Sequence, residues 1–176
     1  TVEENFSIEI EGCVEVDFSG FISAIDIIGG VDIELNRAEA YHLSNNQGLS
    51  FTEGTNNLTG ETALAYSRIR YIGNADYERT ERQRNVLAAV FDKLKDSGIK
   101  TLLELADDVL PHITTNLTPT RIITMVTNVI LTDISNIESY RIPADGEFIE
   151  TTIRDMAVLV PNIPENSRLL KEYIGY

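Results

Sequence analysis

The chain has 176 residues, 43% of them hydrophobic, and this length and composition suit a globular domain with a substantial core. Its 14 lysines and arginines stand against 28 aspartates and glutamates. The resulting formal net charge of −14 predicts repulsion from nucleic acid and no general attraction to anionic membranes. With Cys13 as the single cysteine, an internal disulfide and a cysteine-based zinc site are both excluded.

Neither a membrane span nor a signal peptide is visible in the sequence. No run approaches the roughly 20 apolar residues that a spanning helix needs. The first residues, TVEENFSIEIEG, have neither a basic start nor an apolar stretch. Because the first residue is not Met either, we expect that the sequence begins inside a longer protein.

The first third of the chain predicts a strand, a helix and a second strand. Cys13–Phe18 alternates apolar and polar residues, as a half-buried strand does. Ser19 is typical of a helix N-cap, and Gly29-Gly30 is expected to end that helix before a strand at Val31–Leu35. This order resembles a βαβ unit. The polar residues 36–58 are expected to be irregular, with an exposed turn at 45–48.

The rest of the chain is predicted to be mainly helical. Thr59 is typical of the N-cap of a short helix, which leads into an extended stretch at Ser67–Tyr71. Asp76 is typical of the N-cap of a long helix over Tyr77–Lys95. Three further helices are predicted, over about Lys100–Leu110, from Thr118-Pro119 to about Leu131, and over Pro164–Ile174. Between the last two, the sequence predicts a strand at Ile137–Ile142 and a turn at 144–146.

These elements predict a mixed α/β fold, specifically a layered α-β-α domain with a central mixed sheet. No internal repeat, low-complexity tract or linker divides the chain. We therefore expect residues 1–176 to belong to one domain.

Five of the fourteen cationic residues cluster within seventeen positions, namely Arg68, Arg70, Arg79, Arg82 and Arg84. On the long predicted helix, Arg79 and Gln83 share a stripe with apolar residues, Arg82 lies at its edge and Arg84 points away. A guanidinium on a buried stripe needs an anion, and the first turns of a helix favour one. Convergence of Arg68, Arg70, Arg79 and Gln83 on one phosphate or diphosphate is therefore one interpretation. The other is a solvated salt-bridge face formed with Asp76, Glu78 and Glu81.

Two stretches around these arginines resemble the signature of the LytR–CpsA–Psr family. Residues 58–70, LTGETALAYSRIR, match a Leu-x-Gly-x-x-Ala-Leu-x-Tyr-x-Arg-x-Arg segment, and residues 76–83, DYERTERQ, match Asp-x-x-Arg-x-x-Arg-Gln. Residues 16–35 and TTNLT at 114–118 are similar to further segments of the family. The resemblance covers almost the whole chain and corresponds to the C-terminal portion of the family's catalytic domain.

The resemblance implies a Mg²⁺-dependent phosphotransferase that moves a polyprenyl-diphosphate-linked glycopolymer, such as teichoic acid or capsule, to peptidoglycan. It places the parent protein at the extracytoplasmic face of the bacterial cell membrane, held by an anchor that this chain does not contain. It assigns the catalytic role to Arg68, Arg70, Arg79 and Gln83, with Asp76 and Arg82 as secondary substrate-binding residues. Candidates for an apolar pocket around the lipid are Val86, Val90, Leu94, Ile122 and Val126, each of which is also an ordinary core residue by pattern.

The sequence departs from the family in that the N-terminal half, with its metal-binding aspartates, is not present. We therefore predict no metal ligands in this chain, expect the Mg²⁺ ligands before Thr1, and expect the isolated chain to lack strands of the sheet and to be inactive. Asp26, Asp107 and Asp108 are interpreted as helix-surface residues. His42 and His112, with no carboxylate partner at ligand spacing, are expected on the surface or in loops.

Two other functions remain open from the sequence. One is a non-catalytic module that binds polyprenyl phosphate or a wall polymer. The other is an envelope-related transcriptional attenuator, although the net charge of −14 disfavours direct contact with DNA.

Overall fold

The computed structural model describes residues 1–70, 75–95, 97, 99–122, 124–125 and 138–175, with the side chains of 75–77, 99, 102, 103 and 106 left out of the description. The chain divides into two compact units. The terminal unit combines Thr1–Cys13 with Ser135–Tyr176, and the central unit is Val14–Ile134. The single domain over residues 1–176 stays a prediction.

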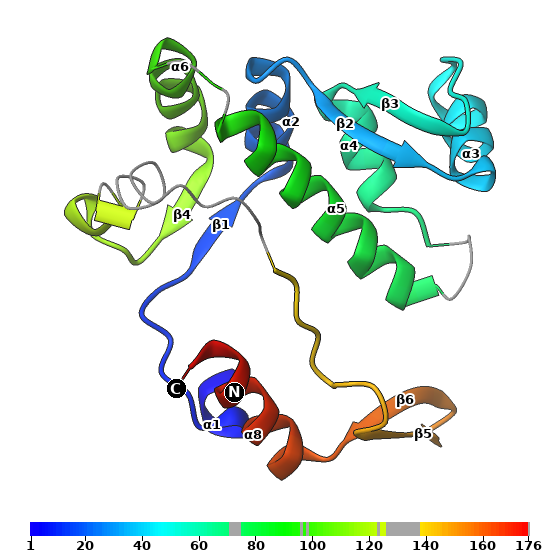
Figure 1. The fold of residues 1–176 in the computed structure, drawn as a ribbon, viewed down its shortest axis with the longest axis vertical. Helices are drawn as coiled ribbons and strands as arrows, with labels where there is room; N and C mark the ends of the chain where they lie inside the picture. Colours follow the sequence, from blue (N-terminus) through cyan, green and yellow to red (C-terminus); the bar gives the residue numbers. More distant parts are fainter. Residues whose placement is uncertain (71–74, 96, 98, 123, 126–137, 176) are drawn as a thin grey trace. The chain divides into compact units, whose positions relative to one another are not determined.

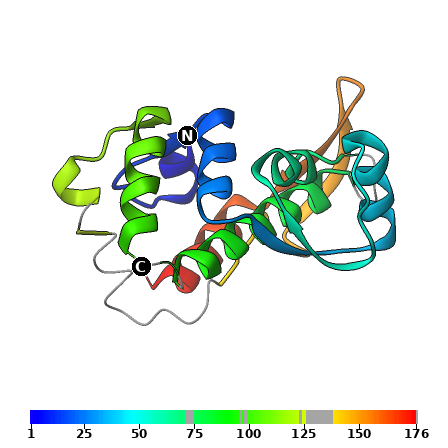
Figure 2. The same ribbon diagram turned by 90° about the horizontal axis from the view of Figure 1, so that it is seen from above.

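The central unit contains most of the helices (Figure 1). Its elements in chain order are β1 (Val14–Val16), α2 (Phe18–Ile27), β2 (Val31–Leu35), α3 (Arg37–Gln47), β3 (Gly54–Leu58), α4 (Gly60–Ser67), α5 (Ala75–Lys95), α6 (Ile99–Val109), the 3₁₀ turn η1 (Leu110–His112) and β4 (Ile113–Thr115). The view from above shows α2 and α6 side by side (Figure 2). In the described part of the chain, no helix combines the length and the apolar character that crossing a bilayer requires.

The core of the central unit is built on β2. Val31, Ile33 and Leu35 are buried while the residues between them are exposed, so one face of the strand packs inward. Apolar side chains from α2, α3, α4 and α5 cover this face, among them Ile25, Leu43, Ala40, Ala63, Tyr66 and Val86. The strand predicted at Val31–Leu35 is thus confirmed, and its alternation is the pattern that identified it.

Residues 36–58, predicted to be irregular, are instead a helix and a strand. Asn36 and Glu39 form a capping box that starts α3, and β3 pairs with β2 in antiparallel register from Gly54 to Leu58. The prediction was wrong because neither element shows a clear hydrophobic pattern. Helix α3 buries only a few apolar side chains, and the residues of β3, GTNNL, are mostly polar. Tertiary packing determines both elements more than their own hydrophobic pattern does.

The predicted βαβ unit is not formed. In the described residues, β1 pairs with β4 and β2 pairs with β3, so the strands on either side of α2 belong to different sheets. Both pairs are antiparallel. The mixed class of helices and strands is confirmed, but the described strands form separate two-stranded sheets rather than one central mixed sheet. Hydrophobic pattern identifies a strand without showing its partner.

Gly60, the glycine of the Leu-x-Gly motif, lies where α4 meets α2. Its N–H donates to the Asp26 carboxylate at 2.7 Å, so Asp26 on α2 caps the start of α4 rather than being only a surface residue. A Cβ at position 60 would lie 2.7 Å from the Cα of Ile22. The motif glycine is therefore required by the close approach of two helices.

The N-cap of α2 lies two residues before the predicted one. Asp17, not Ser19, is the N-cap, and its Oδ1 accepts a hydrogen bond from the N–H of Gly20 at 2.8 Å. The start after Thr118 is as predicted, because the Arg121 N–H donates to the Thr118 hydroxyl at 3.3 Å. The predicted end of that helix, at residues 126–131, lies outside the described residues.

The terminal unit consists of helices from both ends of the chain and one hairpin. Its elements are α1 (Val2–Phe6), β5 (Phe148–Ile153), β6 (Met156–Pro161) and α8 (Ile163–Ile174) (Figure 1). The C-terminal helix is confirmed. The strand predicted at Ile137–Ile142 is not found over residues 138–142, and position 137 lies outside the described residues. The hairpin that follows was not predicted.

Asn166 is the polar centre of the terminal unit. Its side chain is fully buried, and its Oδ1 accepts from the Ala144 N–H at 2.7 Å. Its Nδ2 donates to the carbonyl oxygens of Glu147 and Asn162 at 2.8 and 2.9 Å. One side chain thus satisfies backbone groups in the turn before β5 and at the start of α8, which ties the two segments together.

We predict that Asn166→Ala lowers the free energy of unfolding of the terminal unit by about 2 kcal/mol, because it leaves the part-buried Ala144 N–H without its acceptor. Asn162→Ala is the matched control, since its exposed side chain donates only to the Glu147 carboxylate in the described contacts. Urea unfolding of both variants measures the difference. Equal destabilisation by the two substitutions would contradict the central role of Asn166.

Candidate functional site

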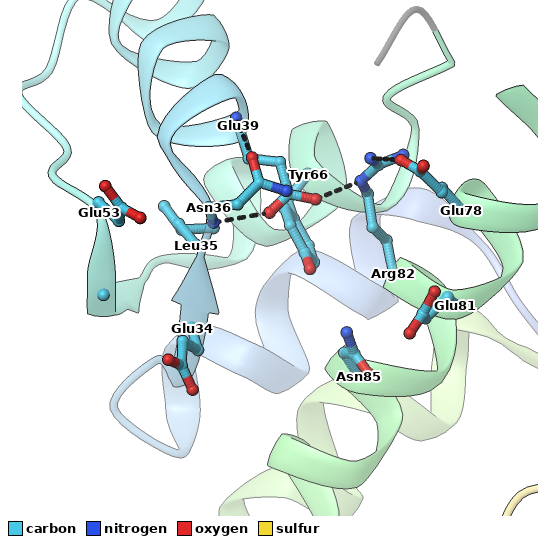
Figure 3. Close-up of a pocket in the computed structure, with 11 residues that line it drawn as sticks. Glu34, Leu35, Asn36, Glu39, Glu53, Tyr66, Glu78, Glu81, Arg82 and Asn85 are labelled. Carbon is cyan, nitrogen blue, oxygen red and sulfur yellow. Dashed lines mark hydrogen bonds and ion pairs between the residues drawn. The ribbon is translucent and has the colours of Figure 1, made fainter. Parts of the chain in front are cut away.

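Arg82 lies at the centre of a buried ion network in the central unit. The residue is 2% exposed, and its Nε donates to the Glu39 carboxylate at 2.6 Å. Its Nη2 donates to Glu78 at 2.8 Å and its Nη1 to the backbone oxygen of Ile69 at 3.2 Å. Figure 3 shows the guanidinium between the two carboxylates. A buried arginine is tolerated because charged partners and a carbonyl replace the water that it loses.

Glu39 connects this network to the start of α3. One carboxylate oxygen accepts from the Asn36 N–H at 3.0 Å, which completes the capping box, and the other accepts from Arg82 (Figure 3). Glu39 is itself 6% exposed. A single buried carboxylate therefore joins the end of β2 and the beginning of α3 to the second turn of α5.

An open pocket of about 520 Å³ lies beside the network. Its lining residues are Glu34, Leu35, Asn36, Glu39, Glu53, Gly54, Tyr66, Glu78, Glu81, Arg82 and Asn85. Five of these residues are glutamates, and the one arginine is held by two of them. Because carboxylates repel anions, this pocket is not the place where a diphosphate would bind.

Tyr66, the tyrosine of the Tyr-x-Arg-x-Arg motif, contributes its ring to the core and borders the pocket. Burial raises the pKa of its phenol, and the negative charges of Glu39 and Glu81 add to this effect, whereas a hydrogen bond with Asn85 and the charge of Arg82 oppose it. The phenol is therefore neutral at physiological pH. Its ring packs in the core.

The inward face of α5 differs from the predicted one. Arg82 and Val86 are buried, whereas Gln83, which was predicted to lie on the buried stripe, is exposed, and Leu87 is 62% exposed. The prediction of the buried face was wrong because Arg82, as a charged residue, was placed at the edge of the buried stripe. Glu39, 43 positions earlier, makes burial of Arg82 possible, and no local pattern shows that partner.

The arginines assigned to the diphosphate lie around the segment that links α4 to α5. Arg68 is the C-cap of α4 in helical geometry, rather than part of an extended stretch, and its exposed guanidinium lies 5.1 Å from the centre of the Phe18 ring. Arg70 is exposed and Arg79 half-buried in the second turn of α5. Residues 71–74 between them lie outside the description, and convergence on one anion stays a prediction.

Asp76 lies in the first turn of α5, which begins at Ala75, and not at the predicted cap position. Its side chain is outside the described part, so its role near Arg79 stays a prediction. Helix starts are the least certain boundaries in any pattern-based prediction.

The candidate lipid-pocket residues are mainly core residues where the structure describes them. Val86 belongs to the buried core and Val90 packs against it. Leu94 and Ile122 are half-buried, and Val126 lies outside the description. An apolar pocket for a lipid stays a prediction.

The described residues contain no group of three or more His, Cys, Asp or Glu side chains placed to hold a metal ion. Carboxylates that stand near the motif are already engaged, Asp26 by Gly60 and Asp17 by His112. These residues do not fit a Mg²⁺ site.

His112 has a carboxylate partner that is distant in the sequence. Its Nδ1 lies 3.1 Å from an oxygen of Asp17, 95 positions away. The hydrogen bond from the Gly20 N–H and the interaction with His112 hold the pKa of Asp17 below its usual value. The pair connects η1 to the cap of α2.

Comparisons with known proteins all indicate the same family. The LytR_cpsA_psr family matches residues 1–172. Polyisoprenyl-teichoic acid–peptidoglycan teichoic acid transferase TagV of Bacillus subtilis is 32% identical over 121 residues, which are 66% of this chain and 31% of TagV. TagU of Oceanobacillus iheyensis, which carries the same transferase name, is 30% identical over 178 residues, and the match covers 100% of this chain and 52% of TagU.

A solved structure has the same fold. Bacillus subtilis TagT superposes with a TM-score of 0.77 at 22% identity, over 100% of this chain and 66% of the TagT chain. The chain therefore spans about half the length, or less, of the two curated relatives, and about two thirds of the solved TagT chain.

We predict that Glu39→Ala lowers the free energy of unfolding of the central unit by about 3–5 kcal/mol, because it leaves the buried Arg82 without one of its carboxylates and removes the α3 cap. Glu53→Ala is the control, since Glu53 lines the same pocket but is exposed. Urea unfolding measures both. An effect of Glu39→Ala no larger than that of Glu53→Ala would show that the network contributes little.

Proposed function

Because the chain belongs to the LytR_cpsA_psr family, we propose that it forms part of a cell-wall phosphotransferase that moves a polyprenyl-diphosphate-linked glycopolymer to peptidoglycan. The observation that carries this proposal is the match to transferases named for that reaction, which in TagU of Oceanobacillus iheyensis runs over the whole chain. Teichoic acid is the polymer that those names specify, and we propose the same class of anionic wall polymer here.

In this reaction a peptidoglycan hydroxyl oxygen forms a bond to the phosphorus that carries the glycan. The bond from that phosphorus to the bridging oxygen breaks, polyprenyl phosphate leaves with the bonding electrons, and the hydroxyl proton is released to water. Negative charge accumulates on the phosphoryl oxygens and on the leaving group. Fixed cations that surround these oxygens lower the barrier mainly by positioning and electrostatic stabilisation.

We assign that role to Arg68, Arg70 and Arg79, with Gln83 as a neutral donor. Support comes from their arrangement along the chain, at the end of α4 and in the first turns of α5, where free N–H groups of the helix add positive potential. Arg82 has a different environment, since its described partners are Glu39, Glu78 and a backbone oxygen. For Arg82 we propose that it holds α5, and with it Arg79, against β2 and α3.

The test of this assignment is glycan transfer by the complete protein, supplied with Mg²⁺, a polyprenyl-diphosphate-linked glycan and peptidoglycan. We predict that Arg68→Ala and Arg79→Ala each reduce transfer at least about a hundredfold, because each removes a charged donor to the transferring group. Arg84→Ala, on the same helix but outside the assigned set, keeps nearly full activity. Unfolding curves confirm that the variants remain folded.

Two results would decide against the proposal. Normal transfer by both Arg68→Ala and Arg79→Ala would reject the assigned roles. If the unaltered protein binds the lipid-linked glycan and the two variants do not, yet no transfer occurs under any condition, the chain belongs to a non-catalytic binding module.

We further propose that transfer depends on Mg²⁺ whose ligands lie in polypeptide outside these 176 residues, and that the protein acts at the extracytoplasmic face of the membrane. The isolated chain is then inactive in the transfer assay. Addition of EDTA to the complete protein abolishes transfer, and Mg²⁺ restores it. Transfer by the isolated chain, or transfer that EDTA leaves unchanged, would refute this part of the proposal.

A further inference from the structure

Phe18 is an aromatic residue whose position the core of the central unit does not explain. It is the first residue of α2, directly after the Asp17 cap. Among the described residues, the core cluster and the side chains packed on it include Phe21 and Ile25 from the same helix but not Phe18. The contact that the structure gives the Phe18 ring is with the Arg68 guanidinium, whose carbon lies 5.1 Å from the ring centre. This ring therefore serves an arginine rather than the core.

Helices α2 and α4 pack against each other in opposite directions, and this arrangement brings Phe18 and Arg68 together. Near the end of α2, Asp26 accepts a hydrogen bond from the Gly60 N–H at the start of α4, at 2.7 Å. Phe18 begins α2, and Arg68 is the C-cap of α4. The helices have 10 and 8 residues, about 15 and 12 Å at the helical rise, so one antiparallel pair accounts for both contacts. The pair is joined at both of its ends.

The first turn of α2 is held in place by η1. The Asp17 carboxylate accepts from the Gly20 N–H at 2.8 Å, and its second oxygen lies 3.1 Å from His112 Nδ1. A Cβ at position 20 would lie 2.5 Å from the Cβ of His112, so η1 packs directly on this turn. The backbone that carries Phe18 is therefore fixed by a cap, a histidine contact and close packing, and its ring has a defined place from which to act on Arg68.

An aromatic partner suits an anion-binding arginine better than a carboxylate partner does. Among the described ion pairs, Arg82 takes part in two with glutamates, whereas Arg68 takes part in none. A carboxylate occupies the N–H donors of a guanidinium and opposes its charge, so that an incoming phosphate has to displace it. The face of a ring attracts the cation without accepting its in-plane N–H groups. The charge and the donors of Arg68 thus stay available to a phosphate.

Contact with the ring also lowers the entropic cost of using Arg68. An arginine side chain has many rotamers, and ordering it around an anion opposes binding. The Phe18 ring restricts the Arg68 side chain before the anion arrives, so part of that ordering is already complete. Catalysis by fixed cations gains most when the cations are held in place in advance.

We propose that Phe18 is a positioning residue for Arg68, whose guanidinium its ring holds beside the start of α2 with the charge and the N–H donors available to a diphosphate. The inference rests on the proposed function, because it gives Phe18 a role through Arg68 in the same site. Phe18 itself touches no reacting atom. The role requires an aromatic ring, and an aliphatic side chain of similar size does not perform it.

The first test is glycan transfer by the complete protein, measured as kcat/KM for the polyprenyl-diphosphate-linked glycan. Phe18→Leu keeps the apolar bulk but removes the ring, and we expect kcat/KM to fall about threefold to fivefold, the effect of one cation–aromatic contact with an exposed arginine. Phe18→Tyr keeps the ring and transfers normally. The matched control is Phe91→Leu, which removes a contact of the same kind, with Lys95 Nζ at 5.3 Å, outside the assigned site and leaves kcat/KM unchanged.

A double substitution separates positioning from a purely structural role. In an Arg68→Ala background the ring has no guanidinium to hold, so the addition of Phe18→Leu lowers transfer no further. An equal loss from Phe18→Leu in both backgrounds, or a loss that Phe18→Tyr shares, would show that Phe18 only supports the fold. Either outcome would overturn the proposal.

NMR of the Arg68 side chain tests the contact without reference to transfer. Protons over the face of an aromatic ring resonate upfield, so we expect an upfield Nε–H signal for Arg68, identified by its loss in Arg68→Ala. Phe18→Leu removes the upfield shift, whereas Phe18→Tyr and Phe91→Leu keep it. An Arg68 signal without an upfield shift in the unaltered protein would show that the ring does not hold the guanidinium, and the proposal would fail.

Failure of the proposed function is recognised separately. If the unaltered protein transfers no glycan under any condition, the readout becomes its affinity for inorganic diphosphate, followed through the same Arg68 signal. A decrease of this affinity by about threefold to fivefold in Phe18→Leu supports the positioning role even though the transferase assignment has failed. An affinity that Phe18→Leu leaves unchanged overturns the positioning role as well.

Discussion

The burial of Arg82 between Glu39 and Glu78 is the interaction on which the arrangement of the central unit depends. A guanidinium at 2% exposure is unfavourable unless charged partners satisfy it, and the nearer of its partners comes from a helix 43 positions earlier in the chain. This constraint holds α5 in one rotational setting. It also places the start of α3, and therefore the end of β2, next to the helix that carries Arg79. The core of the central unit is apolar, so the hydrophobic effect supplies most of the stability, and the ion network fixes the position of α5 on that core.

The same interaction separates two groups of arginines that look alike in the sequence. Arg82 faces inward and is bound to glutamates, in a pocket whose charge is negative. Arg68 and Arg70 are exposed at the end of α4, and Arg68 lies over the Phe18 ring. Glu39 and Glu78 thus surround Arg82, whereas Arg68 lies against an aromatic ring.

Motif residues that sequence comparison treats as a single signature therefore have different physical roles. Gly60 allows α4 to approach α2 and receives a cap from Asp26, Tyr66 fills the core with a neutral phenol, and Arg82 locks the helix. These roles are structural, and they bring the remaining arginines to the ends of two helices. In the terminal unit Asn166 has the comparable position, since one buried amide joins the turn before the hairpin to the last helix. Each unit thus contains buried polar side chains that link separate segments, Arg82 and Glu39 in the central unit and Asn166 in the terminal unit.

The sequence by itself determined the features that local physics controls: the alternation of Val31–Leu35, the glycines that end α2, the start of α4 after Thr59, and the helices at α5, α6 and α8. It also contained the motifs that identify the family. It did not determine which strands pair, that residues 36–58 contain a helix and a strand, or which face of α5 is buried. Those depend on partners distant in the chain, such as Glu39 for Arg82 and β3 for β2. Tertiary structure decided them because the energy of burying a charge or completing a sheet depends on contacts that no local pattern records.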